Sequence, residues 1–282
     1  LMLKNNTISF QGEYGANSHL ACKNVYPEME ALPCHTFEDV FESVKSGKSS
    51  LAMIPIENSV AGRVADIHYL LPESGLFIIK EHFQKVNHCL LAKKGANLED
   101  LQNVYSHIQA LSQCRKNLHK LNLTSRVYAD TAGAAKKISL GNKKSEGAIA
   151  SEFASEIYKL KILIKNFEDE EHNTTRFVIL SKNAKRPKLQ SGNAITSFVF
   201  QVRNVPSALY KAMGGFATNN INMTKLESYQ LKGSFTATQF YADVEGHLED
   251  KNLKLAMEEL KFYTSKLIIL GVYSADRLRE KI

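Results

Sequence analysis

The sequence TFEDVFESVKSGKSSLAMIPI, residues 36–56, combines a well-marked helix with the strand that follows it. Thr36 is a suitable N-cap, and Asp39 stands three residues further on, as in a capping box. Gly47 is suited to end the helix, since glycine tolerates the left-handed backbone found just past a helix C-terminus. The apolar residues 51–56 predict a strand, so the stretch indicates one helix–strand step of an α/β fold.

The same alternation continues on both sides of this stretch. Upstream, residues 7–10 predict a strand and residues 16–26 a helix. Downstream, apolar runs predict strands at 77–79, 88–92, 104–106, 147–150 and 177–180, and helical spacing predicts helices at 110–120, 131–139 and 151–158. This rhythm is typical of βαβ units and predicts a domain built on a parallel sheet.

The residue composition of the sequence changes after this region. Residues 181–193, SKNAKRPKLQSGN, are polar and basic without apolar periodicity, which is typical of a linker. The remaining segments predict, in order, a strand, a helix, two strands, a helix and a strand, at 195–202, 206–218, 221–229, 234–244, 248–263 and 266–273. The order βαββαβ predicts a small ferredoxin-like α+β domain.

The charge and the cysteines exclude several classes of protein. The chain of 282 residues carries a net charge of +7, which could attract nucleic acid or small anions. No run of basic residues exceeds two and no aromatic residues are interleaved with them, so we expect no nucleic-acid partner. None of the four cysteines forms a C-x-x-C pair, so we expect free thiols and no metal site.

Location follows from two further patterns. Residues 1–7 have no apolar core of the kind that a signal peptide needs, and no stretch approaches the roughly 18 apolar residues of a membrane span. The sequence therefore predicts a cytoplasmic protein that does not enter a membrane.

Small polar side chains gather at four predicted strand ends or loop starts, which is where open α/β sheets usually bind ligands. The segments are PIENS at 55–59, SHIQAL at 106–111, DTAGAA at 130–135 and NTTRF at 173–177. Ser106 and Thr131 could also be simple helix N-caps, and Arg176 could form a structural ion pair instead of binding a carboxylate. Taken together, the four segments predict a pocket rich in hydrogen-bond donors, which suits an anion.

These residues resemble those of the prephenate dehydratases. The resemblance rests on FQGEYGANS at 10–18, PIENSVAGRV at 55–64, SHIQALSQC at 106–114, DTAGAA at 130–135 and NTTRF at 173–177. The later stretch at 204–228 is similar to the ACT domain, a regulatory module that follows the catalytic domain in this family. The resemblance implies a catalytic domain at 7–182, a linker at 183–194 and an ACT domain at 195–274. It further implies two α/β lobes around a cleft, 7–81 with 171–182 and 82–170, like those of the type II periplasmic binding proteins.

The resemblance also implies roles for individual residues. Thr175 is the expected catalytic residue, a hydrogen-bond donor to the oxygen that leaves prephenate; its neighbour Thr174 would face the other side of the strand. Substrate-binding residues are expected at Glu57, Asn58, Ser59, Ser106, Gln109, Thr131 and Arg176. No cofactor is implied.

Regulation and assembly are implied by the C-terminal part. A phenylalanine effector is expected at Asn204, Ala208, Leu209, Glu227 and Ser228, between subunits of a homodimer or homotetramer. The family's usual ESRP is replaced here by Glu227-Ser228-Tyr229-Gln230. Two alternatives stay open: an arogenate dehydratase, and a two-lobed solute-binding protein, against which the apparent lack of a signal peptide and the appended domain argue.

Overall fold

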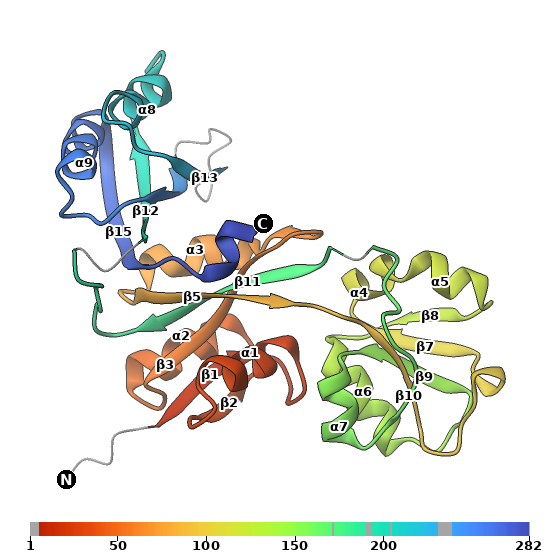
Figure 1. Cartoon of the computed structure of the whole chain (residues 1–282). Helices are drawn as coiled ribbons and strands as arrows, with labels where there is room; N and C mark the ends of the chain where they lie inside the picture. The colour runs from red at the N-terminus through yellow and green to blue at the C-terminus, as the bar shows by residue number, and fades with distance from the viewer. Residues whose placement is uncertain (1–5, 171, 190–192, 204, 231–238, 282) are drawn as a thin grey trace, which may run out of the picture. The chain divides into compact units, whose positions relative to one another are not determined.

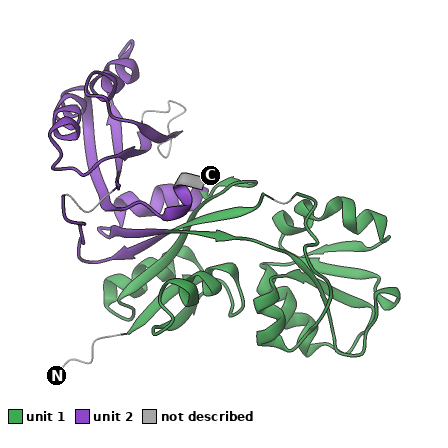
Figure 2. Cartoon of the chain, viewed as in Figure 1, with its two compact units in different colours: residues 1–64, 82–177 green, residues 65–81, 178–282 purple. Residues whose placement is uncertain are grey.

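The computed structural model describes residues 6–170, 172–189, 193–203, 205–230 and 239–281. The chain forms two compact units, one of Leu1–Val64 with His82–Phe177 and one of Ala65–Glu81 with Val178–Ile282 (Figure 2). These units differ from the predicted domains, because the segment Ala65–Glu81 groups with the C-terminal part of the chain. The predicted domain and lobe boundaries therefore stay a prediction.

The first unit contains a small sheet built around the helix and strand of residues 36–58. Strand β1 (Thr7–Gln11) pairs in parallel with β2 (Glu30–Cys34) and β3 (Leu51–Asn58), and the short β4 (Gly62–Arg63) is antiparallel to β3. Helices α1 (Asn17–Val25) and α2 (Phe37–Ser46) connect the parallel strands. The predicted capping box of α2 and its left-handed Gly47 are both confirmed.

The same unit contains a second sheet, in the order β10-β6-β9-β7-β8. Its strands are β6 (Cys89–Ala92), β7 (Asn103–Ser106), β8 (Thr124–Val127), β9 (Glu146–Ala150) and β10 (Lys161–Ile164). The prediction of a parallel sheet was wrong for β6, which pairs antiparallel with both β9 and β10. Strands β7, β8 and β9 are parallel to one another, which confirms the prediction for β7 and β9, whereas β8 was not predicted as a strand.

Helices cover both faces of this second sheet: α4 (Ile108–Gln113) and α5 (Arg115–Lys120) on one, α6 (Thr131–Leu140) and α7 (Glu152–Tyr158) on the other (Figure 1). The alternation along β6 shows why. Leu90 packs with α4 and α5, whereas its neighbour Leu91 packs with α6 and α7. Both faces are apolar, so the polar strand ends are the part of the sheet left for ligands.

The prediction of one helix at 110–120 was wrong, because α4 ends at Gln113 and α5 begins at Arg115. The carboxylate of Asp169 accepts hydrogen bonds from the backbone N–H groups of Lys116, at 2.8 Å, and Asn117, at 3.2 Å. This side chain satisfies the first donors of a new helix, so the chain restarts its helical turn there.

The second unit contains the predicted βαββαβ order. The elements are β12 (Ala194–Val202), α8 (Ala208–Thr218), β13 (Met223–Tyr229), β14 (Gln239–Glu245), α9 (Lys251–Tyr263) and β15 (Thr264–Ser274), with strand order β13-β14-β12-β15 and all neighbours antiparallel. Both helices contribute to one apolar core with the sheet, in which Phe198, Phe216 and Leu253 are buried. Helix α8 begins at Ala208 and not at Pro206, because Ser207 takes a left-handed conformation before it.

Two strands connect the units covalently. β5 (Phe77–Lys85) and β11 (Thr174–Ser181) each begin in one unit and end in the other. The second unit also holds α3 (Ala65–Glu73), the 3₁₀ helix η2 (Arg277–Lys281) and the contact of β15 with β5, where Gly271 pairs with Ile78.

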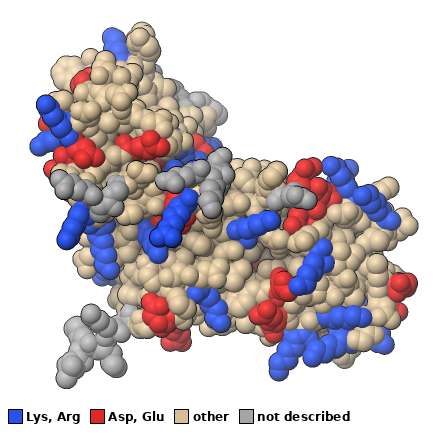
Figure 3. Space-filling view, in the orientation of Figure 1, with Lys and Arg blue, Asp and Glu red and all other residues tan. Residues whose placement is uncertain are grey.

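The surface agrees with the scattered charges of the sequence. On the face drawn in Figure 3, Lys and Arg side chains are mixed with Asp and Glu side chains. Among the described residues, no helix has the length and apolar character needed to cross a membrane.

Candidate active site

The candidate site lies where β3 ends and β11 begins. Ser59 joins the two strands: its N–H donates to the carbonyl of Thr174 at 2.9 Å, and its hydroxyl accepts from the N–H of Thr174, also at 2.9 Å. The Ser59 hydroxyl donates in turn to the carbonyl of His172 at 2.9 Å. The hydroxyl predicted to bind substrate is thus engaged by backbone, and it fixes the start of β11.

Asn58 and Thr175 meet across these two strands. The Nδ2 of Asn58 donates to Oγ1 of Thr175 at 2.9 Å and to Oδ1 of Asn173 at 2.7 Å. The Oδ1 of Asn58 accepts from the backbone N–H groups of Val60, at 3.0 Å, and Ala61, at 2.8 Å. Thr175 is half-buried, so a ligand can approach it while Asn58 holds it in place.

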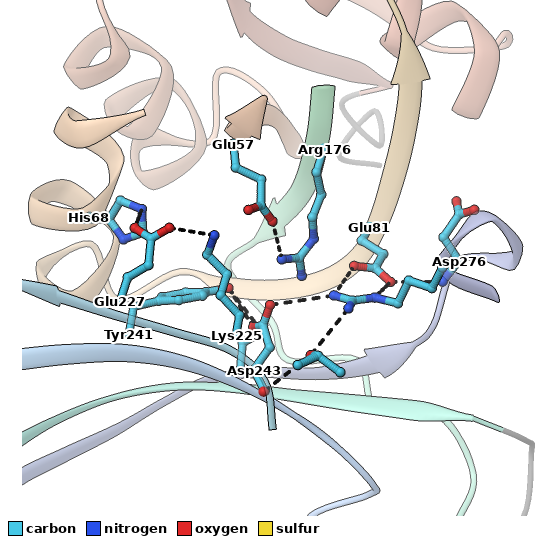
Figure 4. Close-up of polar contacts among 12 residues, drawn as sticks. Glu57, His68, Glu81, Arg176, Lys225, Glu227, Tyr241, Asp243 and Asp276 are labelled. Atoms are coloured by element: carbon cyan, nitrogen blue, oxygen red, sulfur yellow. Dashed lines mark hydrogen bonds and ion pairs between the residues drawn. The ribbon is translucent and has the colours of Figure 1, made fainter. Parts of the chain in front are cut away.

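Glu57 and Arg176 form a second pair one residue away from the first. The guanidinium of Arg176 is 2.9 Å from Oε1 of Glu57, and its side chain is only 3% exposed (Figure 4). Adjacent residues of a strand point to opposite faces, so this pair and the Asn58–Thr175 pair lie on opposite faces. Of the two interpretations given to Arg176, the structure has the ion pair, and carboxylate binding by Arg176 stays a prediction.

The second sheet places the next predicted residues at the ends of β7 and α4. Ser106 is fully buried and its hydroxyl donates to the carbonyl of Ile149 at 2.6 Å, which joins β7 to β9. It is not the N-cap of α4, because that position belongs to His107, whose Nδ1 accepts from the N–H of Gln109 at 3.3 Å. Gln109 is exposed in the first turn of α4, where its side chain can reach a ligand.

Thr131 is the first residue of α6 and is half-buried. The N-cap of this helix is Asp130, whose carboxylate accepts from the N–H of Gly133 at 2.7 Å. The Thr131 hydroxyl is therefore not needed as a cap, which leaves the binding role as the better interpretation for this residue.

Three polar residues near Thr175 were missed by the sequence reasoning, the buried Asn173 and His88 and the half-buried Gln113. Asn173 is 2% exposed and its Nδ2 donates to Oε1 of Gln113 at 2.8 Å. The same Oε1 lies 2.8 Å from Nε2 of His88, and burial lowers the pKa of His88, which keeps this imidazole neutral. Asn173 and Gln113 stand inside NTTRF and SHIQALSQC, so their amides were a usable signal, whereas a lone His88 before a strand gave none.

A pocket of about 220 Å³ lies beside Asn173 and Gln113. Its other lining residues are Val60, Ser112, Lys116, Glu168, Asp169 and Glu170. Three carboxylates against one ammonium group disfavour an anion, so this pocket does not match the anion site that the sequence predicts. In the part of the chain that the structure describes, no group of His, Cys, Asp or Glu side chains is arranged to hold a metal ion.

The effector candidates of the second unit fall into different environments. Ala208 is buried and Leu209 packs against the same apolar core, so neither presents a polar group to a ligand. The carboxylate of Glu227 is 2.7 Å from Nζ of Lys225 and 3.8 Å from Nε2 of His68 (Figure 4). Ser228 is exposed.

The remaining effector candidate, Asn204, lies outside the described residues. Tyr229, which follows Ser228 where the family usually has Arg, is buried and accepts a hydrogen bond from Nε2 of Gln239 at 2.5 Å. Burial raises its pKa to about 12, so this phenol stays neutral and supplies no charge to an effector.

Two sheets with polar residues at strand ends, together with a βαββαβ order later in the chain, define an enzyme-like α/β architecture. The family model of prephenate dehydratase matches residues 8–185. The chain belongs to the prephenate dehydratase family.

Relatives of known function agree with this family. A bifunctional N-acyl-homoserine lactone acylase/prephenate dehydratase of Komagataeibacter europaeus is 48% identical over 97% of this chain and 98% of its own length. Arogenate dehydratase/prephenate dehydratase 2 of Arabidopsis thaliana is 39% identical over 95% of this chain and 73% of its own. Both matches extend beyond the region of the family model.

Solved structures extend the likeness to the whole fold. GqqA, a quorum-quenching acylase, is 48% identical with a TM-score of 0.90, covering 97% of this chain and 99% of its own. A prephenate dehydratase from Arthrobacter aurescens in complex with L-Phe is 26% identical with a TM-score of 0.87, covering 95% of this chain and 90% of its own.

Proposed function

We propose that this chain is a prephenate dehydratase of L-phenylalanine biosynthesis. In the reaction, the ring carboxylate leaves as carbon dioxide and its bonding electrons enter the ring. The ring hydroxyl leaves with its own electron pair and takes up one proton, which gives phenylpyruvate and water. The contact between Asn58 and Thr175 at the site is the observation that carries the proposal, because it holds a hydroxyl where the family's catalytic threonine is expected.

Thr175 acts as the hydrogen-bond donor to the departing oxygen. A neutral alcohol is a weak acid, so it stabilises the developing hydroxide without giving up its proton fully. Positioned proton donation contributes roughly 10²–10⁴-fold to the rate. We assign Gln109 and Thr131, at the first turns of α4 and α6, as donors to the two substrate carboxylates, with the helix N-terminus of α6 adding to the attraction.

The remaining predicted residues take supporting roles in this proposal. Ser59 and Ser106 hold backbone through their hydroxyl groups, and the Glu57–Arg176 ion pair supports the strand face behind Thr175. Their direct contact with prephenate is the weaker interpretation, because the polar atoms already have protein partners.

The test compares Thr175→Val with Thr174→Val, a matched substitution at the adjacent residue, on the opposite face of the strand. Phenylpyruvate formation is measured with prephenate, and phenylalanine formation with arogenate. We expect Thr175→Val to lose at least about 100-fold in kcat, with Thr174→Val within about threefold of the wild type. Equal rates in the two variants would remove Thr175 from the mechanism. Turnover of arogenate but not of prephenate would show that arogenate is the substrate.

The architecture of the enzyme is part of the same proposal. The catalytic domain spans 7–182 in two lobes like those of type II periplasmic binding proteins, 183–194 is the linker, and 195–274 is an ACT domain. The βαββαβ order supports the ACT domain, and the L-Phe complex of the Arthrobacter relative supports phenylalanine as effector. Calorimetric titration with phenylalanine, beside Glu227→Gln, tests this point; binding unchanged in the variant would move the effector site away from β13.

Assembly, location and the binding-protein alternative stay predictions. Light scattering at the concentration used for the assays should give the mass of two chains for a homodimer or of four chains for a homotetramer. The cytoplasmic location is tested by fractionation of cells. Tight binding of prephenate without turnover would favour a solute-binding protein over the enzyme.

A second activity is favoured by one observation, the 48% identity over nearly the full length with a relative that is also an N-acyl-homoserine lactone acylase. In such a reaction, water cleaves the amide bond to give a fatty acid and homoserine lactone. Incubation with an N-acyl-homoserine lactone and detection of free homoserine lactone by mass spectrometry tests it. The Thr175→Val variant shows whether the two activities share a site.

A further inference from the structure

The hydrogen bonds around Asn58 have only one possible direction. A backbone N–H can donate but not accept, so the Asn58 atom that faces the N–H groups of Val60 and Ala61 is its carbonyl oxygen. The Nδ2 group therefore faces Asn173 and Thr175. Nδ2 has two hydrogens, and these two contacts, at 2.7 and 2.9 Å, are shorter than its third contact, 3.3 Å to the carbonyl of Thr174.

The direction set at Asn58 passes to the next residues. The Asn173 atom that accepts from Asn58 is Oδ1, so its Nδ2 donates to Gln113. The Gln113 atom that accepts from Asn173 is Oε1, and this same oxygen faces Nε2 of His88 at 2.8 Å. Nε2 of His88 must then carry the proton, which leaves Nδ1 as the unprotonated nitrogen of the neutral imidazole. Nδ1 is buried and has no hydrogen-bond partner among the described residues.

At the other end, the same direction determines what Thr175 can do. Its oxygen accepts from Asn58, so its own proton does not point along that bond. A hydroxyl has a single proton, and here that proton is left for a group in the site. Had the Asn58 amide been turned round, Thr175 would donate to Asn58 and offer a ligand only lone pairs.

We propose that Asn58, Asn173, Gln113 and His88 are positioning residues that make Thr175 a hydrogen-bond donor toward the substrate. This inference rests on the proposed function, since it explains how the catalytic hydroxyl of that reaction is held. The four residues, named here the amide chain, extend from the end of β3 through the start of β11 to α4 and β6. They link Thr175 of the first sheet to the second sheet, whose covering helices α4 and α6 contain Gln109 and Thr131.

The sharpest test reverses the direction of the hydrogen bonds along the amide chain with one isosteric substitution, Asn58→Asp. Both oxygens of the introduced carboxylate accept, so Thr175 and Asn173 must both donate to it. Asn173 then presents Oδ1 to Gln113, Gln113 presents Nε2 to His88, and the His88 proton moves from Nε2 to Nδ1. Two-bond ¹H–¹⁵N spectra of the imidazole groups, assigned with His88→Gln, show which nitrogen is bare.

We expect the wild type to show a protonated Nε2 at His88 and Asn58→Asp to show a protonated Nδ1. The same variant should lose about 100-fold in kcat, whereas charge repulsion of the substrate would act on KM. The matched control is Asn24→Asp, which changes the net charge of the protein by the same amount. The amide of Asn24 is exposed and donates to Gln84 at 2.8 Å. We expect this control variant to keep wild-type kinetics and the wild-type His88 spectrum.

A second pair of variants serves if Asn58→Asp does not fold. His88→Gln keeps a donor toward Gln113 and should retain a kcat within about threefold of the wild type, whereas His88→Leu lacks the donor and should lose about tenfold in kcat with KM unchanged. Equal kcat in these two variants, or a bare Nε2 in the wild type, would overturn the amide chain. Lack of turnover by the wild type would instead remove the proposed function, while the spectrum would still report the direction.

Discussion

Ser106 gives the clearest test of how the site divides between binding and support. Its hydroxyl is completely buried and donates to the carbonyl of Ile149 at 2.6 Å. Ser106→Ala leaves this buried carbonyl without that donor, and an acceptor deprived of its partner costs about 1–3 kcal/mol. For a protein of this size, each kcal/mol lowers Tm by roughly 2–4 °C, so a cost of about 1–3 kcal/mol predicts a fall in Tm of about 2–12 °C. The reacting groups stay in place, so kcat/KM of the folded protein should change by less than about twofold.

The assay combines thermal unfolding with prephenate kinetics below the transition. Ser125→Ala, an exposed serine in the adjacent strand β8, is the matched control and should change neither quantity. If Ser106 binds substrate, the opposite pattern appears: Tm is retained and kcat/KM falls about tenfold, the equivalent of about 1.4 kcal/mol. That pattern would refute the structural assignment of Ser106 and return it to the binding site.

Three further predictions concern stability. Burial lowers the pKa of His19 from 6.5 to about 4, so the unfolded chain binds more protons than the folded chain between these pH values. The free energy of unfolding should therefore fall by on the order of 3 kcal/mol as the pH drops through this window. In His19→Asn, the midpoint of urea unfolding should change less with pH than in the wild type. Gly271→Ala places a methyl group against the carbonyl oxygen of Ile78, so we expect a loss of at least about 1–3 kcal/mol, and an unchanged Tm would contradict the observed pairing. Thr36→Ala removes the acceptor for the Asp39 N–H and should cost about 1 kcal/mol in urea unfolding, with no effect on kcat.

The elements that were predicted best are those whose signals are local. The capping box of α2 and the glycine after it need only neighbouring residues, and both are present. The break between α4 and α5 could not be predicted, because Asp169, which caps α5, is about 50 residues away in the sequence. The antiparallel β6 was missed for a related reason: an apolar run fixes a strand but not the direction of the strand beside it.

The site shows the same limit at the level of single atoms. The polar segments were found because small polar residues at strand ends are a local pattern. Whether a hydroxyl faces a ligand or a carbonyl depends on contacts between distant segments, as for Ser106 with Ile149 and Ser59 with His172. A pattern of residue types therefore predicts a polar site at the strand ends, but it does not predict which of these side chains already have backbone partners.

The pairing of the ends of β3 and β11 explains why two short segments, 117 residues apart at Asn58 and Thr175, carry so much of the site. Each segment alternates between the two faces of its strand. Glu57 and Arg176 therefore meet on one face as an ion pair, while Asn58 and Thr175 meet on the other as a hydrogen bond. Shifting either strand by one residue would exchange the faces and separate both pairs at once. The ion pair of the buried Arg176 with the half-buried Glu57 thus supports the register in which Thr175 accepts its hydrogen bond from Asn58, so a contact on one face fixes the polar contact on the other.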